Sequence, residues 1–121
     1  MQSCADDLSG TWRADDERKS QFKITDDGKQ VVLEPRYPIA GDYGPFKTVL
    51  ARKGQGLVGT TSTTYTQNGK TCPVTFASRI DSCKGGKLEL WGETQFEIKI
   101  ETCAFSSNGV MQNANLVREK P

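Results

Sequence analysis

The sequence predicts an all-β protein, an antiparallel up-and-down β-barrel of eight or nine strands. Two observations predict this fold class. Apolar residues recur at a period of two along the chain, and helix-period patterns do not recur. Glycine-containing turns separate these segments and leave short connections, which favour a meander over a Greek key. A β-sandwich of the same strands is the alternative, because strand number does not distinguish the two folds.

Length and charge restrict the possible partners. The chain has 121 residues, the size of one domain, so a single barrel is expected over residues 1–121. Its 16 basic and 15 acidic residues give a net charge of +1, which provides no field to attract a polyanion. Nucleic acid is therefore not an expected partner. No apolar run reaches the roughly 20 residues that cross a bilayer, so no transmembrane segment is expected.

Three strands are expected in the first third of the chain. The first covers residues 8–14, and the next two, 22–24 and 31–33, flank a turn at residues 26–28 and form a hairpin. Residues 35–45 hold three of the five prolines, so we expect a loop of about ten residues there. Loops of this length are often functional, although a plain crossover at one end of the sheet is the simpler interpretation.

Six further strands are expected after this loop, separated by turns that contain glycine. The dipeptide Asn68-Gly69 is the strongest hairpin signal, because both central residues of a type I′ turn need a positive φ. The clearest alternation places Phe96, Ile98 and Ile100 on one face of their strand. The six predicted strands cover residues 46–52, 57–66, 74–80, 88–91, 96–101 and 110–118.

The cysteines indicate the compartment. Four cysteines in a small chain predict two disulfides, and disulfides persist in oxidising compartments, so a secreted or periplasmic protein is expected. No signal peptide precedes Ser3-Cys4, and the chain is expected to be a mature form. Ser3-Cys4 also has the small residue and the cysteine of a bacterial lipoprotein processing site. A lipid anchor at Cys4 is therefore an alternative to a disulfide at this residue.

The strand pattern ranks the three possible cysteine pairings. Cys72 and Cys83 lie at the two ends of one predicted strand, about 36 Å apart, which is too far for a disulfide. In a hairpin that turns at Glu93, the register that pairs the apolar residues also places Cys83 opposite Cys103. We therefore predict Cys83–Cys103 and, by elimination, Cys4–Cys72. In a strict meander Cys4 and Cys72 would lie at opposite ends of the barrel, so the second bond requires the long loop or an N-terminal arm to bring them together.

The residue types argue against catalysis. The sequence contains no histidine, which is the commonest general base and the commonest metal ligand. Adjacent carboxylates such as Asp6-Asp7 lie in turns or on opposite faces of a strand. The cysteines are too widely spaced for a structural zinc site, and no phosphate-binding or dinucleotide-binding motif is present. We expect no enzyme activity, no bound metal and no cofactor.

A run of hydroxyl-bearing residues favours a binding role. Residues 59–66 read Gly-Thr-Thr-Ser-Thr-Thr-Tyr-Thr, so hydroxyls occupy both faces of the predicted strand. A strand that packs on an ordinary core has one apolar face. The inward side of this strand therefore either lines a polar lumen or belongs to an edge strand. Its residues are Thr61, Thr63 and Tyr65.

Three aromatic residues are further candidates for contact with a ligand or a partner. Trp91 alternates out of phase with Leu88 and Leu90, which places it on the outer face as a contact residue or partly under a loop. Tyr37 and Tyr43 lie on the long loop. We expect them at the mouth of the barrel, with packing of the loop onto the barrel wall as the alternative.

Gly10-Thr11-Trp12 resembles the Gly-x-Trp motif that opens the first strand of the calycin superfamily, which includes lipocalins, fatty-acid-binding proteins and avidins. In those families the tryptophan closes one end of an antiparallel barrel and packs on an arginine near the last strand, and Arg118 is at the corresponding place here. The chain departs from the relatives by lacking a readable helical lid and the several pocket tryptophans of avidins. The resemblance implies a lipocalin-like lumen that holds a small ligand.

The sequence therefore predicts an exported, non-catalytic protein that takes a small ligand in the lumen or mouth of its barrel. The alternative is a protein–protein inhibitor or interaction module of the cell envelope, similar to small β-domain inhibitors of proteinases or lysozyme. Convergence of the aromatic residues on a concavity favours a ligand, and a convex aromatic patch favours a protein partner. The predicted ligand-binding residues are Trp12, Tyr37, Tyr43, Thr61, Thr63, Tyr65 and Trp91.

Overall fold

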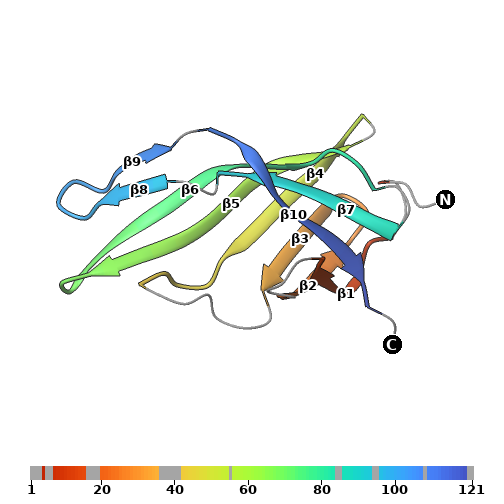
Figure 1. Cartoon of the computed structure of the whole chain (residues 1–121), viewed down its shortest axis with the longest axis horizontal. Coiled ribbons are helices and arrows are strands. Elements are labelled where there is room, and N and C mark those ends of the chain that lie inside the picture. Colours follow the sequence, from red (N-terminus) through yellow and green to blue (C-terminus); the bar gives the residue numbers. More distant parts are fainter. Residues whose placement is uncertain are drawn as a thin grey trace.

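The computed structural model describes residues 4, 7–15, 20–35, 42–54, 56–83, 86–93, 96–107 and 109–119. Eight strands form a closed antiparallel barrel in the order β1-β10-β7-β6-β5-β4-β3-β2, and β8 and β9 form a separate two-stranded sheet (Figure 1). The predicted barrel is confirmed, and the alternative β-sandwich is wrong. The strands are β1 (Gly10–Ala14), β2 (Gln21–Asp26), β3 (Gln30–Pro35), β4 (Lys47–Lys53), β5 (Gly56–Gln67), β6 (Lys70–Ile80), β7 (Lys87–Gly92), β8 (Phe96–Lys99), β9 (Ala104–Ser107) and β10 (Met111–Arg118).

The chain follows an up-and-down path that is interrupted once, between β7 and β10. The predicted hairpin that turns at Glu93 is wrong, because β7 pairs with β6 and β10 and β8 pairs with β9. Leu88 of β7 faces Leu116 of β10, and both side chains are fully buried. Pairing with β10 therefore surrounds Leu88 with apolar side chains, whereas Ile98 of β8 stays partly exposed.

The disulfides join Cys4 to Cys83 and Cys72 to Cys103, with Cα–Cα distances of 5.2 and 5.4 Å. The predicted pairs Cys83–Cys103 and Cys4–Cys72 are wrong. Cys83 follows the end of β6, on the side of the barrel where the N-terminal segment lies, whereas Cys72 lies near the start of the same strand. Cys103 belongs to the turn between β8 and β9, which lies against the start of β6. The sulfur of Cys4 is used in its disulfide and is not available for a lipid thioether.

Trp12 and Leu8 lie at the same end of the barrel as the Cys4–Cys83 disulfide, which we call the closed end. Trp12 is fully buried, and its indole Nε1 donates a hydrogen bond of 2.8 Å to the carbonyl of Leu8. The guanidinium of Arg118 lies 4.7 Å from the centre of the Trp12 ring, a distance suited to a cation–π interaction. This is the arrangement that the Gly-x-Trp resemblance implies for the two residues.

The half of the interior next to the closed end is a packed aliphatic core. Alternate residues of seven barrel strands point inward and bury their side chains almost completely. Each fully buried Leu or Ile contributes about 1.5–3 kcal/mol to the free energy of folding. The fully or almost fully buried aliphatic side chains are Leu8, Ile24, Val31, Leu33, Leu50, Leu57, Ile80, Leu88 and Leu116.

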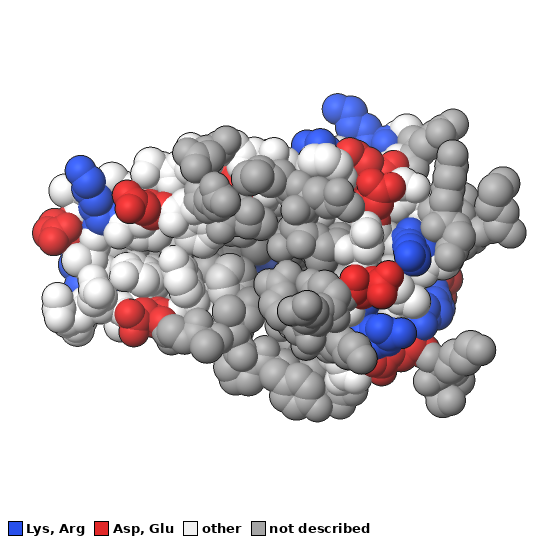
Figure 2. All heavy atoms as spheres, in the orientation of Figure 1, with Lys and Arg blue, Asp and Glu red and all other residues white. Residues whose placement is uncertain are grey.

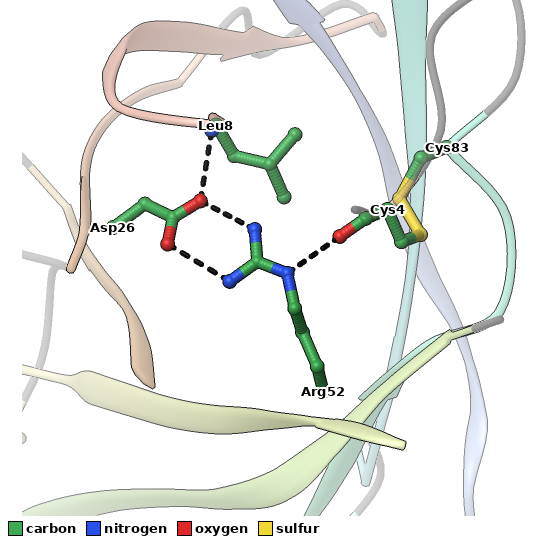
Figure 3. The surroundings of a disulfide bond; sticks show 5 residues. All are labelled: Cys4, Leu8, Asp26, Arg52 and Cys83. Carbon is green, nitrogen blue, oxygen red and sulfur yellow. Dashed lines mark hydrogen bonds and ion pairs between the residues drawn. A yellow bond between two sulfur atoms is a disulfide. The ribbon is translucent and has the colours of Figure 1, made fainter. Parts of the chain in front are cut away.

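An ion pair between Asp26 and Arg52 ties the closed end together (Figure 3). Two guanidinium nitrogens of Arg52 donate to the two carboxylate oxygens of Asp26 at 2.9 and 2.6 Å. Arg52 Nε donates to the carbonyl of Cys4 at 2.8 Å, and the backbone N–H of Leu8 donates to Asp26 Oδ2 at 3.0 Å. One bidentate pair therefore connects β2, β4 and the N-terminal segment, which the disulfide to Cys83 also holds.

The geometry of this pair stabilises the charged form of Asp26, whose side chain is 2% exposed. Hydrogen bonds from Arg52 lower the pKa of Asp26 far below its usual value, and bonds from the backbone N–H groups of Leu8 and Gly28 act in the same direction. Burial of the carboxylate raises the pKa of Asp26 and so opposes these hydrogen bonds. Because the folded-state pKa is depressed, the stabilisation is fully present above the unfolded-state pKa of about 3.9 and is lost as the pH falls below it.

Replacing Asp26 by Asn should therefore lower the free energy of unfolding at neutral pH by about 3 kcal/mol, because Arg52 loses its counter-charge in a mostly buried site. Chemical denaturation at several pH values between 7 and 3 measures the free energy of unfolding of the wild type and of the variant. Wild-type stability should fall steeply below about pH 4, and the variant should lose less over the same range. Asp15→Asn, which removes an exposed ion pair with Lys87, should cost less than about 1 kcal/mol. Equal losses for the two variants would contradict the role of Asp26.

Peptide mapping without reduction should link Cys4 to Cys83 and Cys72 to Cys103. Replacing Cys4 and Cys83 together by serine should lower the free energy of unfolding by about 4 kcal/mol in the chain-entropy model, because the bond spans 79 residues of sequence. The Cys72/Cys103 double serine variant should lose slightly less, since that bond spans 31. Denaturant titration gives both values. Recovery of a Cys83–Cys103 peptide would contradict the β7–β10 pairing as well.

Candidate functional site

The inner face of the barrel changes from aliphatic to hydroxyl-bearing towards the end opposite Trp12. On β5 the inward positions are Leu57, Gly59, Thr61 and Thr63, in that order from the closed end. The threonine-rich run is not an edge strand, because β5 pairs with β4 on one side and with β6 on the other. Its inward hydroxyls therefore lie inside the barrel, as the first of the two sequence interpretations predicts.

Three hydroxyls from neighbouring strands form a chain across this part of the interior. Thr61 Oγ1 on β5 lies 2.7 Å from Thr48 Oγ1 on β4 and 2.6 Å from Ser78 Oγ on β6. Thr63, one inward position further along β5, donates its hydroxyl to the carbonyl of Gly44 at 3.0 Å. Because each of these hydroxyls makes at least one hydrogen bond, the strands tolerate them at positions that would otherwise hold apolar core residues.

Six aromatic rings gather beyond these hydroxyls, and we call them the aromatic cluster. Tyr43 lies at its centre, with ring centroids 5.0 Å from Tyr65, 5.7 Å from Phe46 and 5.9 Å from Phe96. Every ring of the cluster keeps part of its surface exposed, up to 37% for Phe105. The aromatic cluster consists of Tyr43, Phe46, Tyr65, Phe76, Phe96 and Phe105.

The β5–β6 hairpin and the β8–β9 hairpin bring the cluster together. Beyond Ser62, β5 and β6 continue as a two-stranded ribbon past the end of β4, to the left in Figure 1, and β8–β9 lies beside this ribbon. The Cys72–Cys103 disulfide ties the two hairpins together. The rings of Phe76, Phe96 and Phe105 then form a triangle, with centroids 5.5 Å apart for Phe76–Phe96 and Phe96–Phe105 and 6.4 Å apart for Phe76–Phe105.

The structure brings together four of the predicted site residues. Tyr43 and Tyr65 pair across an isolated β-bridge, and Thr61 and Thr63 lie deeper on the same strand as Tyr65. Tyr37 lies outside the described residues. Tyr43 was predicted from its position on the long loop, and Tyr65 from its position on the inward face of the strand that became β5.

Trp12 and Trp91 do not belong to this site. Trp12 is fully buried at the opposite end of the barrel, where the Gly-x-Trp resemblance places it. Trp91 lies on the outer face, as its phase predicts, and the guanidinium of Arg79 stacks over its ring at 4.7 Å. The indole Nε1 of Trp91 has no hydrogen-bond partner among the described residues. The two tryptophans and the cluster are therefore three separate features.

Sequence reasoning missed Thr48, Ser78 and the four phenylalanines of the cluster. The only available signal was that Phe76 alternates in phase with Val74, which places it inward. Phe96 and Phe105 became neighbours through the β8–β9 hairpin, and the sequence pattern had assigned Phe96 to a different partner strand. Whether Phe96 and Phe105 reach the aromatic cluster therefore depends on which strands pair.

The electrostatics of the cluster disfavour a further negative charge. Burial among the rings raises the pKa of the Tyr43 phenol, and the neighbouring Tyr65 and Asp42 act in the same direction because they disfavour a second negative charge. Glu93 lies next to the cluster and accepts a hydrogen bond of 2.8 Å from Ser107, the residue opposite Phe96. On the face shown in Figure 2, acidic and basic side chains are interspersed, in line with the net charge of +1.

Comparisons with models of protein families, with curated proteins and with solved structures found no match. The functional inference therefore depends on the geometry of the site. In the part of the chain that the structure describes, no three His, Cys, Asp or Glu side chains are grouped so as to hold a metal ion. None of the described segments forms a helix long and apolar enough to cross a membrane.

The ultraviolet absorbance of phenolate should show that Tyr43 keeps its proton above pH 10 in the folded protein, because the raised pKa favours the neutral phenol. Subtracting the titration of a Tyr43→Phe variant from that of the wild type isolates this group among the three tyrosines. Circular dichroism checks that both proteins stay folded over the range. A difference curve with its midpoint at or below about pH 10 would contradict the burial of this phenol.

Proposed function

We propose that this chain is an exported, non-catalytic binding protein with a calycin-like barrel, and that it takes a small apolar ligand at the aromatic cluster. The observation that carries the proposal is the position of six partly exposed rings directly beyond a hydroxyl-lined interior. Ligand sites typically combine apolar and aromatic walls with a few polar groups that fix orientation. The rest of the interior is packed, so this is the half of the barrel that a ligand would use.

The placement of the aromatic residues supports a ligand more than a protein partner. Tyr43 and Tyr65 converge with the phenylalanines at one end of the barrel, whereas Trp91 is covered by Arg79 on the outer wall. Tyr43 and Trp91 therefore belong to different surfaces of the barrel. The Gly-x-Trp start with Arg118 over Trp12 adds the calycin-like element to the proposal.

The residue chemistry supports a role without catalysis. The sequence contains no histidine, and all four cysteines are in disulfides. The nucleophiles that remain near the cluster are hydroxyls, and no histidine is available to activate them. The two disulfides also support export, to the periplasm or the cell exterior, because such bonds persist in oxidising compartments.

The second candidate is an inhibitor or interaction module that binds a protein. One observation favours it: Phe105 is 37% exposed on β9, in a hairpin that lies outside the barrel. A partner could place an apolar side chain against this ring. Native mass spectrometry of protein purified from its own host separates the two candidates, since it reports the mass of a retained small molecule or of a stoichiometric partner.

Binding of the neutral fluorophore N-phenylnaphthylamine tests the proposal directly. Removing a ring with Phe105→Ala should raise the dissociation constant about tenfold, because the fluorophore loses one aromatic contact and part of its apolar cover. Val58→Ala is the matched control, since Val58 is 41% exposed but lies on the outer wall between Ala51 and Arg79. It should change the affinity less than about twofold. No binding to the wild type, or equal effects of the two variants, would contradict a ligand site at the cluster.

A further inference from the structure

The hydroxyl chain Thr48–Thr61–Ser78 contains one hydrogen-bond donor more than its internal bonds use. Each hydroxyl has one O–H donor and two acceptor lone pairs. Three hydroxyls joined by two hydrogen bonds therefore leave one donor and several lone pairs unused, whichever way the chain points. The described residues offer these hydroxyls no other partner. A buried donor without a partner is costly, so a guest atom or water is expected to accept this bond.

The hydroxyl chain lies next to the aromatic cluster on the inner face. Thr61 is opposite Phe76 of the cluster in the β5–β6 pair, and Ser78 is the next inward residue of β6 after Phe76. A ligand at the cluster would therefore lie next to the unused donor.

Gly92 places the chain next to the aromatic cluster. It faces Ser78 across the β6–β7 pair, and a Cβ atom added at Gly92 would lie 3.2 Å from Ser78 Oγ and 3.4 Å from Phe76 Cε1. Ser78 Oγ and the ring of Phe76 therefore lie close to each other beside Gly92. A ligand with its oxygen near Ser78 Oγ would lay its apolar body against the rings of the cluster.

The charges that the structure describes around the cluster argue against an anionic head group at this point. The inward side chains of this half, on β4 to β7, are hydroxyls, glycine, apolar residues and aromatic rings, with no Lys or Arg among those that the structure describes. Lys47, next to Phe46, faces the exposed Ser62 on the outer wall. The carboxylate of Glu93 lies beside Ser107 at the rim. An unpaired carboxylate buried here would lose its hydration without gaining a counter-charge.

We propose that the Thr48–Thr61–Ser78 chain donates one hydrogen bond to an uncharged oxygen of the ligand, such as a ketone, ester, amide or hydroxyl oxygen, while an aromatic or alicyclic body packs on the aromatic cluster. This inference rests on the proposed function and specifies the ligand class: neutral, apolar over most of its surface, with one hydrogen-bond acceptor near one end. Carboxylates and other anions of the same shape are rejected by the site.

Three naphthalene fluorophores of nearly equal size test this class: dimethylaminonaphthalene with a propionyl ketone, with a carboxylate, and with neither. The ketone should bind about threefold to tenfold more tightly than the unsubstituted compound, because it accepts the spare hydrogen bond. The carboxylate should bind at least about tenfold more weakly than the ketone. In Thr48→Val/Thr61→Val/Ser78→Ala the ratio of the ketone's affinity to that of the unsubstituted compound should fall to about one, whatever the change in each affinity.

Two single variants keep the test decisive if the triple variant does not fold. Ser78→Ala removes the hydroxyl next to Gly92 and should reduce the ketone's advantage, although Thr48 and Thr61 still hold one unused donor between them. Gly92→Ala adds a methyl group beside Ser78 Oγ and the Phe76 ring and should weaken all three fluorophores about equally. Thermal melts check the folding of each variant. Failure of every fluorophore to bind the wild type would overturn the proposed function itself. Binding of the ketone with no advantage over the unsubstituted compound, or tighter binding of the carboxylate, would overturn this inference and leave the proposed function standing.

Discussion

Closure of the sheet through β10 is the constraint on which the rest of the structure depends. β10 pairs with β1 on one side and β7 on the other, so the sheet closes on itself. This pairing buries Leu88 against Leu116 and brings Arg118 over Trp12. It also excludes β8 and β9 from the barrel. Because they are excluded, the two strands form their own hairpin beside the β5–β6 ribbon and add Phe96 and Phe105 to the aromatic cluster.

The contacts that stabilise the fold and the proposed binding site lie at opposite ends of the barrel. The closed end combines an aliphatic core, the Trp12 indole, the Asp26–Arg52 pair and the Cys4–Cys83 disulfide, which together fix the N-terminal segment. At the other end, hydroxyl-bearing side chains take inward positions that apolar side chains could occupy, and the aromatic rings stay partly exposed. Residues that bind are rarely those that maximise stability, and a strongly held closed end compensates for this loss. The second disulfide, Cys72–Cys103, joins the β5–β6 and β8–β9 hairpins at the end that holds the aromatic cluster.

The candidate site was predictable only where a single strand determines it. Thr61, Thr63 and Tyr65 alternate on β5, so their shared inward face follows from the period of two. Tyr43 was predicted from the composition of its loop. Thr48 and Ser78 look like ordinary strand residues in the sequence, and they matter only because register places them on either side of Thr61. The calycin-like role of Trp12 was implied by a local motif, but its fully buried position removes it from the ligand site.

The sequence by itself determined the fold class, the turn at Asn68-Gly69 and the presence of enough cysteines for two disulfides, because alternation, positive-φ turns and composition are local properties. Only the tertiary structure decided which strands are neighbours, and with that the cysteine pairing and the aromatic cluster. Leu88 and Leu90 have acceptable apolar partners in both the hairpin at Glu93 and the pairing with β10. The choice between them is made by closure of the whole sheet, a long-range gain that no window of sequence contains.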